Sequence, residues 1–192
     1  TNIVEQYAIF RVIGDDEEEQ SKAPLYWYNL NKGVYVKDDT EIKQLINYVD
    51  NQATDKAISE VYNKLFLESK RVPRTHNNNL VIVNNGIFDK SQNKLLSFSP
   101  DYVFTTKIAT NYNPDASSEP VFNGWSVSKW FDEIADGQED KLKLLWQIIT
   151  ASIDANISHE SAIFLIDDGQ GRTGKSTFEN LIMNLVGKNN CG

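Results

Sequence analysis

The feature that most constrains the fold is a glycine-rich motif near the end of the sequence. Residues 169–176 are GQGRTGKS and fit the pattern G-x-x-x-x-G-K-[ST] at every fixed position. Glycines at this spacing let successive backbone N–H groups turn inward around phosphate oxygens, and the positive end of a following helix favours the anion. The apolar run at 161–166 predicts a strand leading into the loop, and the apolar spacing from about Lys175 to Val186 predicts a helix leading out of it.

This loop is predicted to bind the phosphates of ATP together with Mg²⁺. Lys175, the candidate catalytic residue, is expected to reach the β- and γ-phosphates, and the Ser176 hydroxyl is expected to ligate Mg²⁺. The other loop residues in the candidate nucleotide site are Gly169, Gln170, Gly171, Arg172, Thr173 and Gly174.

Several parts that an ATPase needs are missing after the loop. A working site also needs an acidic residue on a neighbouring strand to hold Mg²⁺ and a residue that senses the γ-phosphate. Only 16 residues follow Ser176, and a parallel sheet cannot be built from the single run at 161–166. Because the sequence also starts without Met, we expect a piece of a longer protein, one that shows no ATP turnover by itself.

The composition is that of a globular protein. Of 192 residues, 40% are apolar and 24% charged, which excludes a disordered chain. The apolar runs are too short to cross a bilayer, no secretory signal opens the chain, and the single Cys191 excludes a disulfide framework. A soluble protein of the cytoplasm is therefore expected, with no membrane partner.

The charge is unevenly distributed. The net charge of −8 argues against a large surface that coats nucleic acid, but residues 61–110 carry seven basic and three acidic residues, a net +4. Lys70, Arg71 and Arg74 are candidate DNA contacts in this segment, and the alternative is a solvated helix end.

The four tryptophans are a second class of candidate, because indole rings stack on bases. Trp130 and Trp146 lie in apolar helical patterns, which favours core packing, and Trp27 in a predicted hairpin is the more open case. Trp125 completes the set.

The region before the loop is predicted to be an α+β domain of β-hairpins and amphipathic helices. Strands are expected within 3–13, at 25–28 and 34–36 around a glycine turn, at 80–83, 87–88 and 95–98, and at 102–109. Helices are expected after a capping box at Asp38 and Glu41, then over a second stretch that Pro73 ends, and at about 126–135 and 140–153. We expect three segments: strands and hairpin at 1–37, a mixed domain at 38–157, and the start of an α/β P-loop ATPase domain at 158–192.

Several blocks of this region resemble the phage and plasmid primase-helicases, a family that includes the poxvirus primase-helicase. The blocks are Asn79–Asp89, Leu95–Thr105, Asn111–Pro114, and the pairs Trp130-Phe131 and Leu145-Trp146 that lead into the loop. Their order and spacing carry the resemblance over roughly residues 25–187. The sequence departs from the family pattern at Arg172-Thr173, where Gly-Asn is frequent, and phosphate binding stays plausible.

The resemblance implies a superfamily 3 helicase. Such a protein is an ATP-dependent replicative DNA helicase that forms a ring, usually hexameric, on single-stranded or forked DNA in the host bacterial cell. The region before the loop is then the collar or DNA-handling domain of that ring, and Thr177 joins the Walker A residues.

Two rival interpretations stay open. One keeps the family but makes this piece a non-catalytic oligomerisation or DNA-loading module. The other is an unrelated P-loop enzyme such as a small nucleotide kinase, which normally carries the loop near its start with the whole sheet after it.

Overall fold

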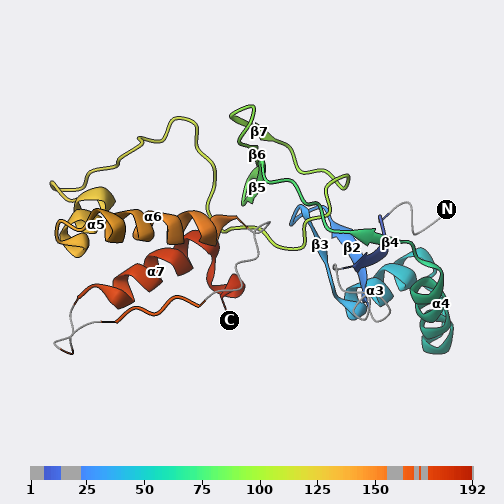
Figure 1. The fold of residues 1–192 in the computed structure, drawn as a ribbon. Helices are drawn as coiled ribbons and strands as arrows, with labels where there is room; N and C mark the ends of the chain where they lie inside the picture. The colour runs from blue at the N-terminus through green and yellow to red at the C-terminus, as the bar shows by residue number, and fades with distance from the viewer. Residues whose placement is uncertain (1–6, 14–22, 155–161, 167–168, 170–172, 192) are drawn as a thin grey trace. The chain divides into compact units, whose positions relative to one another are not determined.

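A computed structural model describes residues 7–13, 23–154, 162–166, 169 and 173–191. These residues form two compact units. The first unit comprises the described residues up to His76 together with Ser97–Thr106, and the second comprises Asn77–Leu96 and the described residues from Lys107 onward. The described part contains two small sheets and five α-helices, in agreement with a mixed α+β fold (Figure 1). The three-segment division at 37 and 157 stays a prediction.

The first unit is a four-stranded sheet with two helices. Its elements are β1 (Phe10–Ile13), β2 (Leu25–Asn29), β3 (Val34–Val36), α3 (Asp39–Val49), α4 (Asp55–Glu68) and β4 (Arg71–Pro73). The strand order is β3-β2-β1-β4, with β4 parallel to β1 and the other neighbours antiparallel. Parallel neighbours need a long crossover, and α3 and α4 supply it.

Each face of this sheet has its own apolar core, because side chains alternate along a strand. Leu25 and Trp27 of β2 pack with the two helices, around the buried side chains of Ile42 and Ile46. Tyr28, from the same strand, belongs to the opposite face, whose buried residues are Val12, Tyr28, Tyr35 and Val103. The segment 97–106 therefore completes the second core of a sheet built mostly from residues 10–73.

The predicted start of α3 is confirmed, and the end predicted for α4 is wrong. The Asp38 carboxylate accepts the N–H groups of Thr40 and Glu41 at 2.9 and 3.0 Å. The Glu41 carboxylate does not close the box but accepts the Trp27 indole N–H at 3.1 Å. α4 ends at Glu68 rather than at Pro73, because Ser69 is extended and the next residues pair with β1 as β4.

The turn between β2 and β3 depends on a glycine, as predicted. Gly33 has φ +71°, and a Cβ added there would overlap the Phe98 ring. The Asn29 side chain accepts hydrogen bonds from the backbone N–H groups of Asn31 and Lys32, both at 3.0 Å. These two backbone donors of the turn therefore have a partner.

The second unit combines a three-stranded meander with three α-helices. Its elements are β5 (Leu80–Val83), β6 (Gly86–Asp89), β7 (Lys94–Leu96), α5 (Val127–Ala135), α6 (Glu139–Ile153), α7 (Lys175–Val186) and the short 3-10 helix η1 (Lys188–Asn190). The strands are antiparallel in the order β5-β6-β7. The three strands and three α-helices lie close to the predicted bounds.

The strand expected at 102–109 is not formed. Its two halves bond to different units: Phe104 accepts the Tyr35 N–H at 2.7 Å in the first, and Ile108 donates to Ile82 at 3.1 Å in the second. The sequence has strand-forming residues throughout, but no single neighbouring strand accompanies the whole segment.

The strand expected at 161–166 is also absent from the residues that can be described there. Residues 162–166 form no strand, and of these five only Leu165 packs against a described core cluster. Ile163, Phe164 and Ile166 are 55%, 79% and 85% exposed. A strand is stabilised by paired neighbours, and the described residues supply none to this segment.

Candidate functional site

The first turn of α7 is the candidate phosphate-binding element. Gly174 precedes the helix with φ +85°, a left-handed conformation that suits glycine, and no side chain caps the helix there. The N–H groups of a first helical turn have no partner within the helix, and the helix dipole makes this end positive. The end of α7 therefore suits an anion.

Five of the described loop residues, 173–177, lie at this end of the helix. Lys175 is half-buried and donates from Nζ to the Thr173 hydroxyl at 3.2 Å, and Ser176 and Thr177 are exposed. Gly169 also has a positive φ, +90°. The predicted residues Gln170, Gly171 and Arg172 lie outside the described residues, so the structure brings together only part of the candidate set.

Buried aromatic and aliphatic side chains hold α7 in place. Phe178, one turn after Lys175, is 3% exposed and lies 5.6 Å from the fully buried Phe131 of α5, measured between ring centroids. At the other end, Val186 packs with Val81 and Val83 of β5. α6 runs beside α7 and adds Leu145 and Ile148 to the same core (Figure 1). The loop is thus attached to a helix with a packed face.

An unpredicted neighbour of the loop is Trp130 of α5. A Cβ built on Gly174 would lie 3.5 Å from Trp130 Cζ2 and 3.6 Å from Ile134 Cδ1. The apolar helical pattern predicts core packing for Trp130, and the ring does pack with Phe131 at 5.4 Å. Its outer edge, however, borders Gly174, a candidate phosphate-binding residue.

The described residues fit a nucleotide's phosphates better than an independent metal site. Lys175, Ser176 and the start of α7 are the groups that a triphosphate requires. No group of three or more His, Cys, Asp or Glu side chains is clustered in the described part of the chain. Among the described residues of the loop, the Ser176 hydroxyl is a group that could ligate Mg²⁺ beside a bound phosphate.

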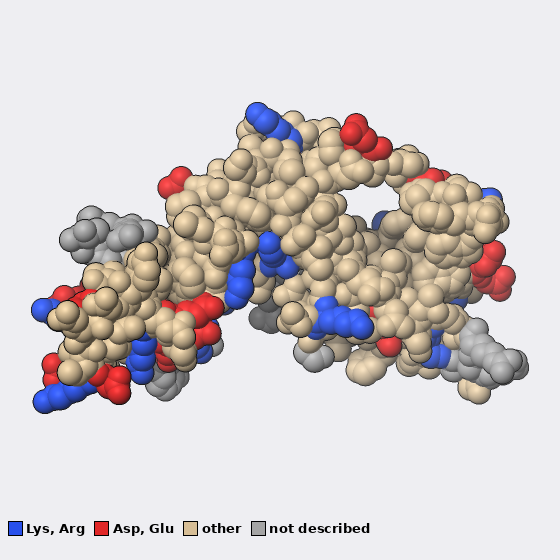
Figure 2. All heavy atoms as spheres, turned by 180° about the vertical axis from the view of Figure 1, so that it is seen from behind, with Lys and Arg blue, Asp and Glu red and all other residues tan. Residues whose placement is uncertain are grey.

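The three candidate DNA contacts lie on and beside the edge strand β4. Lys70, Arg71 and Arg74 are all exposed, and they follow α4 rather than forming its end, because α4 stops at Glu68 and Arg71 belongs to β4. The choice between DNA contact and a solvated surface stays open. Figure 2 shows Lys and Arg in separate groups on the face in view, with acidic groups between several of them. Around α4 the intermixing includes the ion pairs Lys56–Glu60 and Lys64–Glu68.

A buried arginine beside this strand is not evident from the sequence. Arg11 of β1 is 4% exposed and aligned with Arg71. Its Nε donates to the Ala23 carbonyl at 2.8 Å, and its guanidinium lies 4.4 Å from the centroid of the Phe66 ring. Burial lowers the pKa of Arg11, and the positive charge of Arg71 lowers it further.

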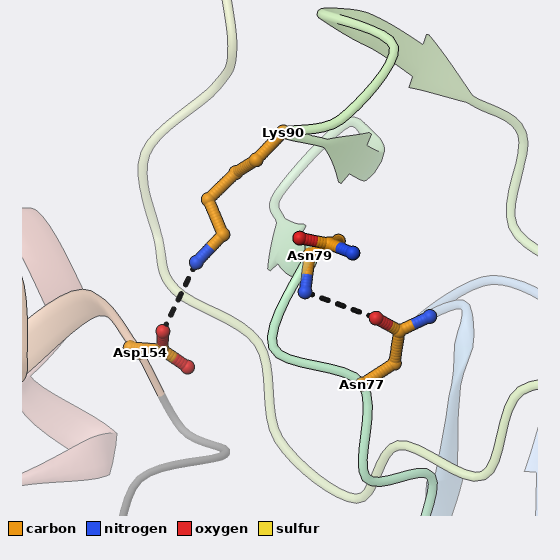
Figure 3. A network of polar contacts seen from close by, with 4 residues as sticks. All are labelled: Asn77, Asn79, Lys90 and Asp154. Carbon is orange, nitrogen blue, oxygen red and sulfur yellow. Dashed lines mark hydrogen bonds and ion pairs between the residues drawn. The ribbon is translucent and has the colours of Figure 1, made fainter.

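A second polar feature that the sequence does not reveal ties the sheet of the second unit to α6. Lys90 Nζ lies 3.2 Å from the carboxylate of Asp154, which is 6% exposed and follows the last residue of α6 (Figure 3). The Lys90 N–H bonds to the Asn79 carbonyl at 2.7 Å, and the Asn79 N–H to the Asn77 side chain at 3.0 Å. This cluster fixes the β6–β7 turn. None of its residues belongs to the candidate loop at 169–177.

No helix in the described ranges is both long enough and apolar enough to cross a membrane.

The chain matches a known protein family. The family model described as "D5 N terminal like" matches residues 6–131, which is more than half of the chain. The matched residues cover the first unit and the β5–β7 sheet and end inside α5, so the loop at 169–177 lies beyond them. The search of curated proteins gives no match.

Proposed function

Because the chain belongs to the D5 N-terminal-like family, whose domain is found in primase-helicase proteins, we propose that it is part of an ATP-dependent replicative DNA helicase. The family supports a replication-related N-terminal domain, and in this proposal that domain is the collar or DNA-handling part of a ring of identical subunits. The ring works on single-stranded or forked DNA in the host cytoplasm. The family match over residues 6–131 is the observation that carries the proposal.

The loop at 169–177 supplies the nucleotide site in this proposal. The N–H groups at the start of α7 and the Lys175 ammonium bind the phosphates, and Ser176 orients Mg²⁺. Gly174 supports this assignment because it has no side chain at the start of the helix and adopts, without strain, the left-handed φ of +85° found there. ATP with Mg²⁺ supplies, by its hydrolysis, the free energy for movement on DNA.

Turnover is not expected from these 192 residues alone. Residues 175–190 form α7 and η1, so no strand among the described residues after the loop presents an acidic residue toward the metal. We therefore expect this chain to bind ATP without hydrolysing it.

Nucleotide binding and turnover test the proposal directly. We expect the 192-residue chain to bind a fluorescent ATP analogue in the presence of Mg²⁺, and Lys175→Ala to weaken that binding at least tenfold, because one charge-assisted contact to phosphate is lost. Steady-state ATP hydrolysis should not exceed that of Lys175→Ala.

Lys188→Ala is the matched control, since Lys188 is an exposed lysine at the opposite end of α7. Equal binding by the parent chain and Lys175→Ala would remove the nucleotide site from the proposal. In that case the same family would support a non-catalytic oligomerisation or DNA-loading module. Lys175-dependent hydrolysis would show that the chain contains a complete site.

A further inference from the structure

An exposed aromatic turn precedes the N-terminus of α5. Phe122 and Trp125 are paired through two backbone hydrogen bonds of 2.9 and 3.0 Å, with Asn123 and Gly124 between them at φ +50° and +81°. Residues paired directly across such a turn place their side chains on the same face. Phe122 is 67% exposed and Trp125 47%, so the turn presents two aromatic side chains to solvent.

Hydrogen bonds brace the turn, so the backbone that carries the two exposed rings has a fixed position. The Ser126 side chain is fully buried, accepts the Lys129 N–H at 3.3 Å and donates to the Glu119 carboxylate at 2.7 Å. Lys129 Nζ donates to the Gly124 carbonyl at 3.0 Å. Hydrogen bonding to Ser126 lowers the pKa of Glu119, so the carboxylate stays ionised and keeps accepting this bond. Large aromatic surface held rigidly in water is typical of a binding site.

Trp130 connects this turn to the phosphate-binding loop. The ring centroids of Trp125 and Trp130 are 6.3 Å apart, and Trp130 in turn borders Gly174, where an added Cβ would lie 3.5 Å from its Cζ2. The exposed Trp125 ring therefore lies one indole away from Gly174, the residue that precedes α7. In a nucleoside triphosphate the base is likewise separated from the β-phosphate by the ribose and one phosphate.

We infer that Trp125, with Phe122 beside it, is the surface on which the base of the bound nucleotide stacks, and that Trp130 borders the ribose. The inference rests on the proposed nucleotide site at 169–177 and adds the part of the ligand that the loop does not touch. Stacking on an indole is tolerant of base identity because every base has a π-face. The site is therefore a purine and pyrimidine nucleoside triphosphate site with little base selectivity, in which the aromatic turn provides affinity for the base.

The test compares two ligands that share their phosphates. Affinities of the 192-residue chain for Mg·ATP and for Mg·tripolyphosphate, which has no base, are measured by displacement of a fluorescent nucleotide. We expect ATP to bind about tenfold more tightly than tripolyphosphate. Trp125→Ala is expected to remove that advantage and leave the tripolyphosphate affinity unchanged, and Trp125→Phe to retain most of it.

Tyr48→Ala is the matched control, because Tyr48 is a 79% exposed aromatic residue on α3 of the first unit. Circular dichroism and the melting temperature verify that each variant is folded. A structural role for Trp125 would lower both affinities together, which would overturn the inference.

Three further outcomes separate this inference from the function it rests on. Equal affinity for ATP and tripolyphosphate, both lost in Lys175→Ala, would overturn the base site and leave the phosphate site standing. Absence of any Lys175-dependent binding would overturn both. Loss of affinity for a thymidine oligonucleotide in Trp125→Ala, with ATP affinity unchanged, would assign the rings to DNA and overturn the inference.

Discussion

At the scale of single residues, the most informative contacts are those that join segments distant in the sequence. Lys90 and Asp154 are 64 positions apart, and Tyr62 and Asp39 are 23 apart. Neither pair follows from a local pattern, because each depends on how a strand or helix is packed. Both can be tested by single substitutions.

Lys90→Ala should destabilise the second unit. It removes the ammonium group that lies 3.2 Å from the carboxylate of Asp154, which is 6% exposed, and breaking a partly buried ion pair by removing one member is costly. Lys90 is itself 42% exposed, so we expect a loss of about 1–2 kcal/mol in the free energy of unfolding. Urea denaturation measures it, and Lys94→Ala, an exposed lysine on β7, is the control. Equal midpoints for the two variants would mean that the ion pair contributes nothing to stability.

Tyr62 makes the first unit sensitive to alkali. Burial raises the pKa of Tyr62 to about 12, and the hydrogen bond of its hydroxyl to Asp39 at 2.7 Å acts in the same direction. The folded pKa is above the unfolded value of 10.0, so the stabilisation is complete below pH 10 and is lost as the pH rises to about 12.

Tyr62→Phe should therefore lose stability less steeply than the parent between pH 10 and 12. The expected cost at pH 7 is about 1 kcal/mol, for one hydrogen bond. Urea midpoints at a series of pH values measure both effects. Tyr48→Phe, at an exposed position, should follow the parent, and an unchanged slope in Tyr62→Phe would contradict the assignment.

At the scale of elements, caps and turns follow the local sequence, whereas some boundaries do not. Asp38 caps α3 and Gly33 makes the β2–β3 turn, both as predicted. The local pattern predicts that residues 71–73 close a helical unit, but they become β4 because β1 offers them a parallel partner. Local chemistry fixes where a helix can start, and pairing with a distant segment decides which structure the chain adopts after the helix ends.

Gly33→Ala should lower the stability of the first unit by more than the positive φ of this residue alone explains. A residue with φ +71° costs about 1–2 kcal/mol when it carries a Cβ, and this Cβ would also overlap Phe98. Gly137 has nearly the same φ, +73°, with no atom within 4 Å of a Cβ, so Gly137→Ala reports the backbone cost alone. In thermal denaturation, the melting temperature of Gly33→Ala should be well below that of Gly137→Ala. Equal melting temperatures would mean that Phe98 moves aside without cost.

At the scale of the whole molecule, the chain builds the first unit from two separate stretches. It leaves that unit after His76, forms the β5–β7 meander in the second, and returns with Ser97–Thr106. The returning segment contributes Val103 to one core, and Pro100 accepts the Tyr35 hydroxyl at 2.6 Å. The family match includes residues 77–96, which belong to the second unit, as well as both stretches of the first unit. This supports treating residues 6–131 as one evolutionary domain.

DNA binding tests the role of that domain. Arg71→Ala with Arg74→Ala should weaken binding of single-stranded DNA and lower the salt slope by about 1.4, for two lost phosphate contacts. Fluorescence anisotropy at several salt concentrations measures both. Lys56→Ala with Lys64→Ala removes the same charge from the same unit, but at cations already paired with Glu60 and Glu68. If the two double variants weaken DNA binding equally, Arg71 and Arg74 make no specific phosphate contacts and act only through the overall charge of the unit.

The sequence by itself determined the elements whose signals are local: the hairpin around Gly33, the cap at Asp38, the amphipathic helices, and α7 starting at Lys175. Only the tertiary structure decided the parallel pairing of β4 with β1, the division of 102–109 between two units, and the approach of Trp130 to Gly174. The physical reason is that propensity, capping and glycine conformation act over a few residues, whereas pairing and packing depend on partners far along the chain.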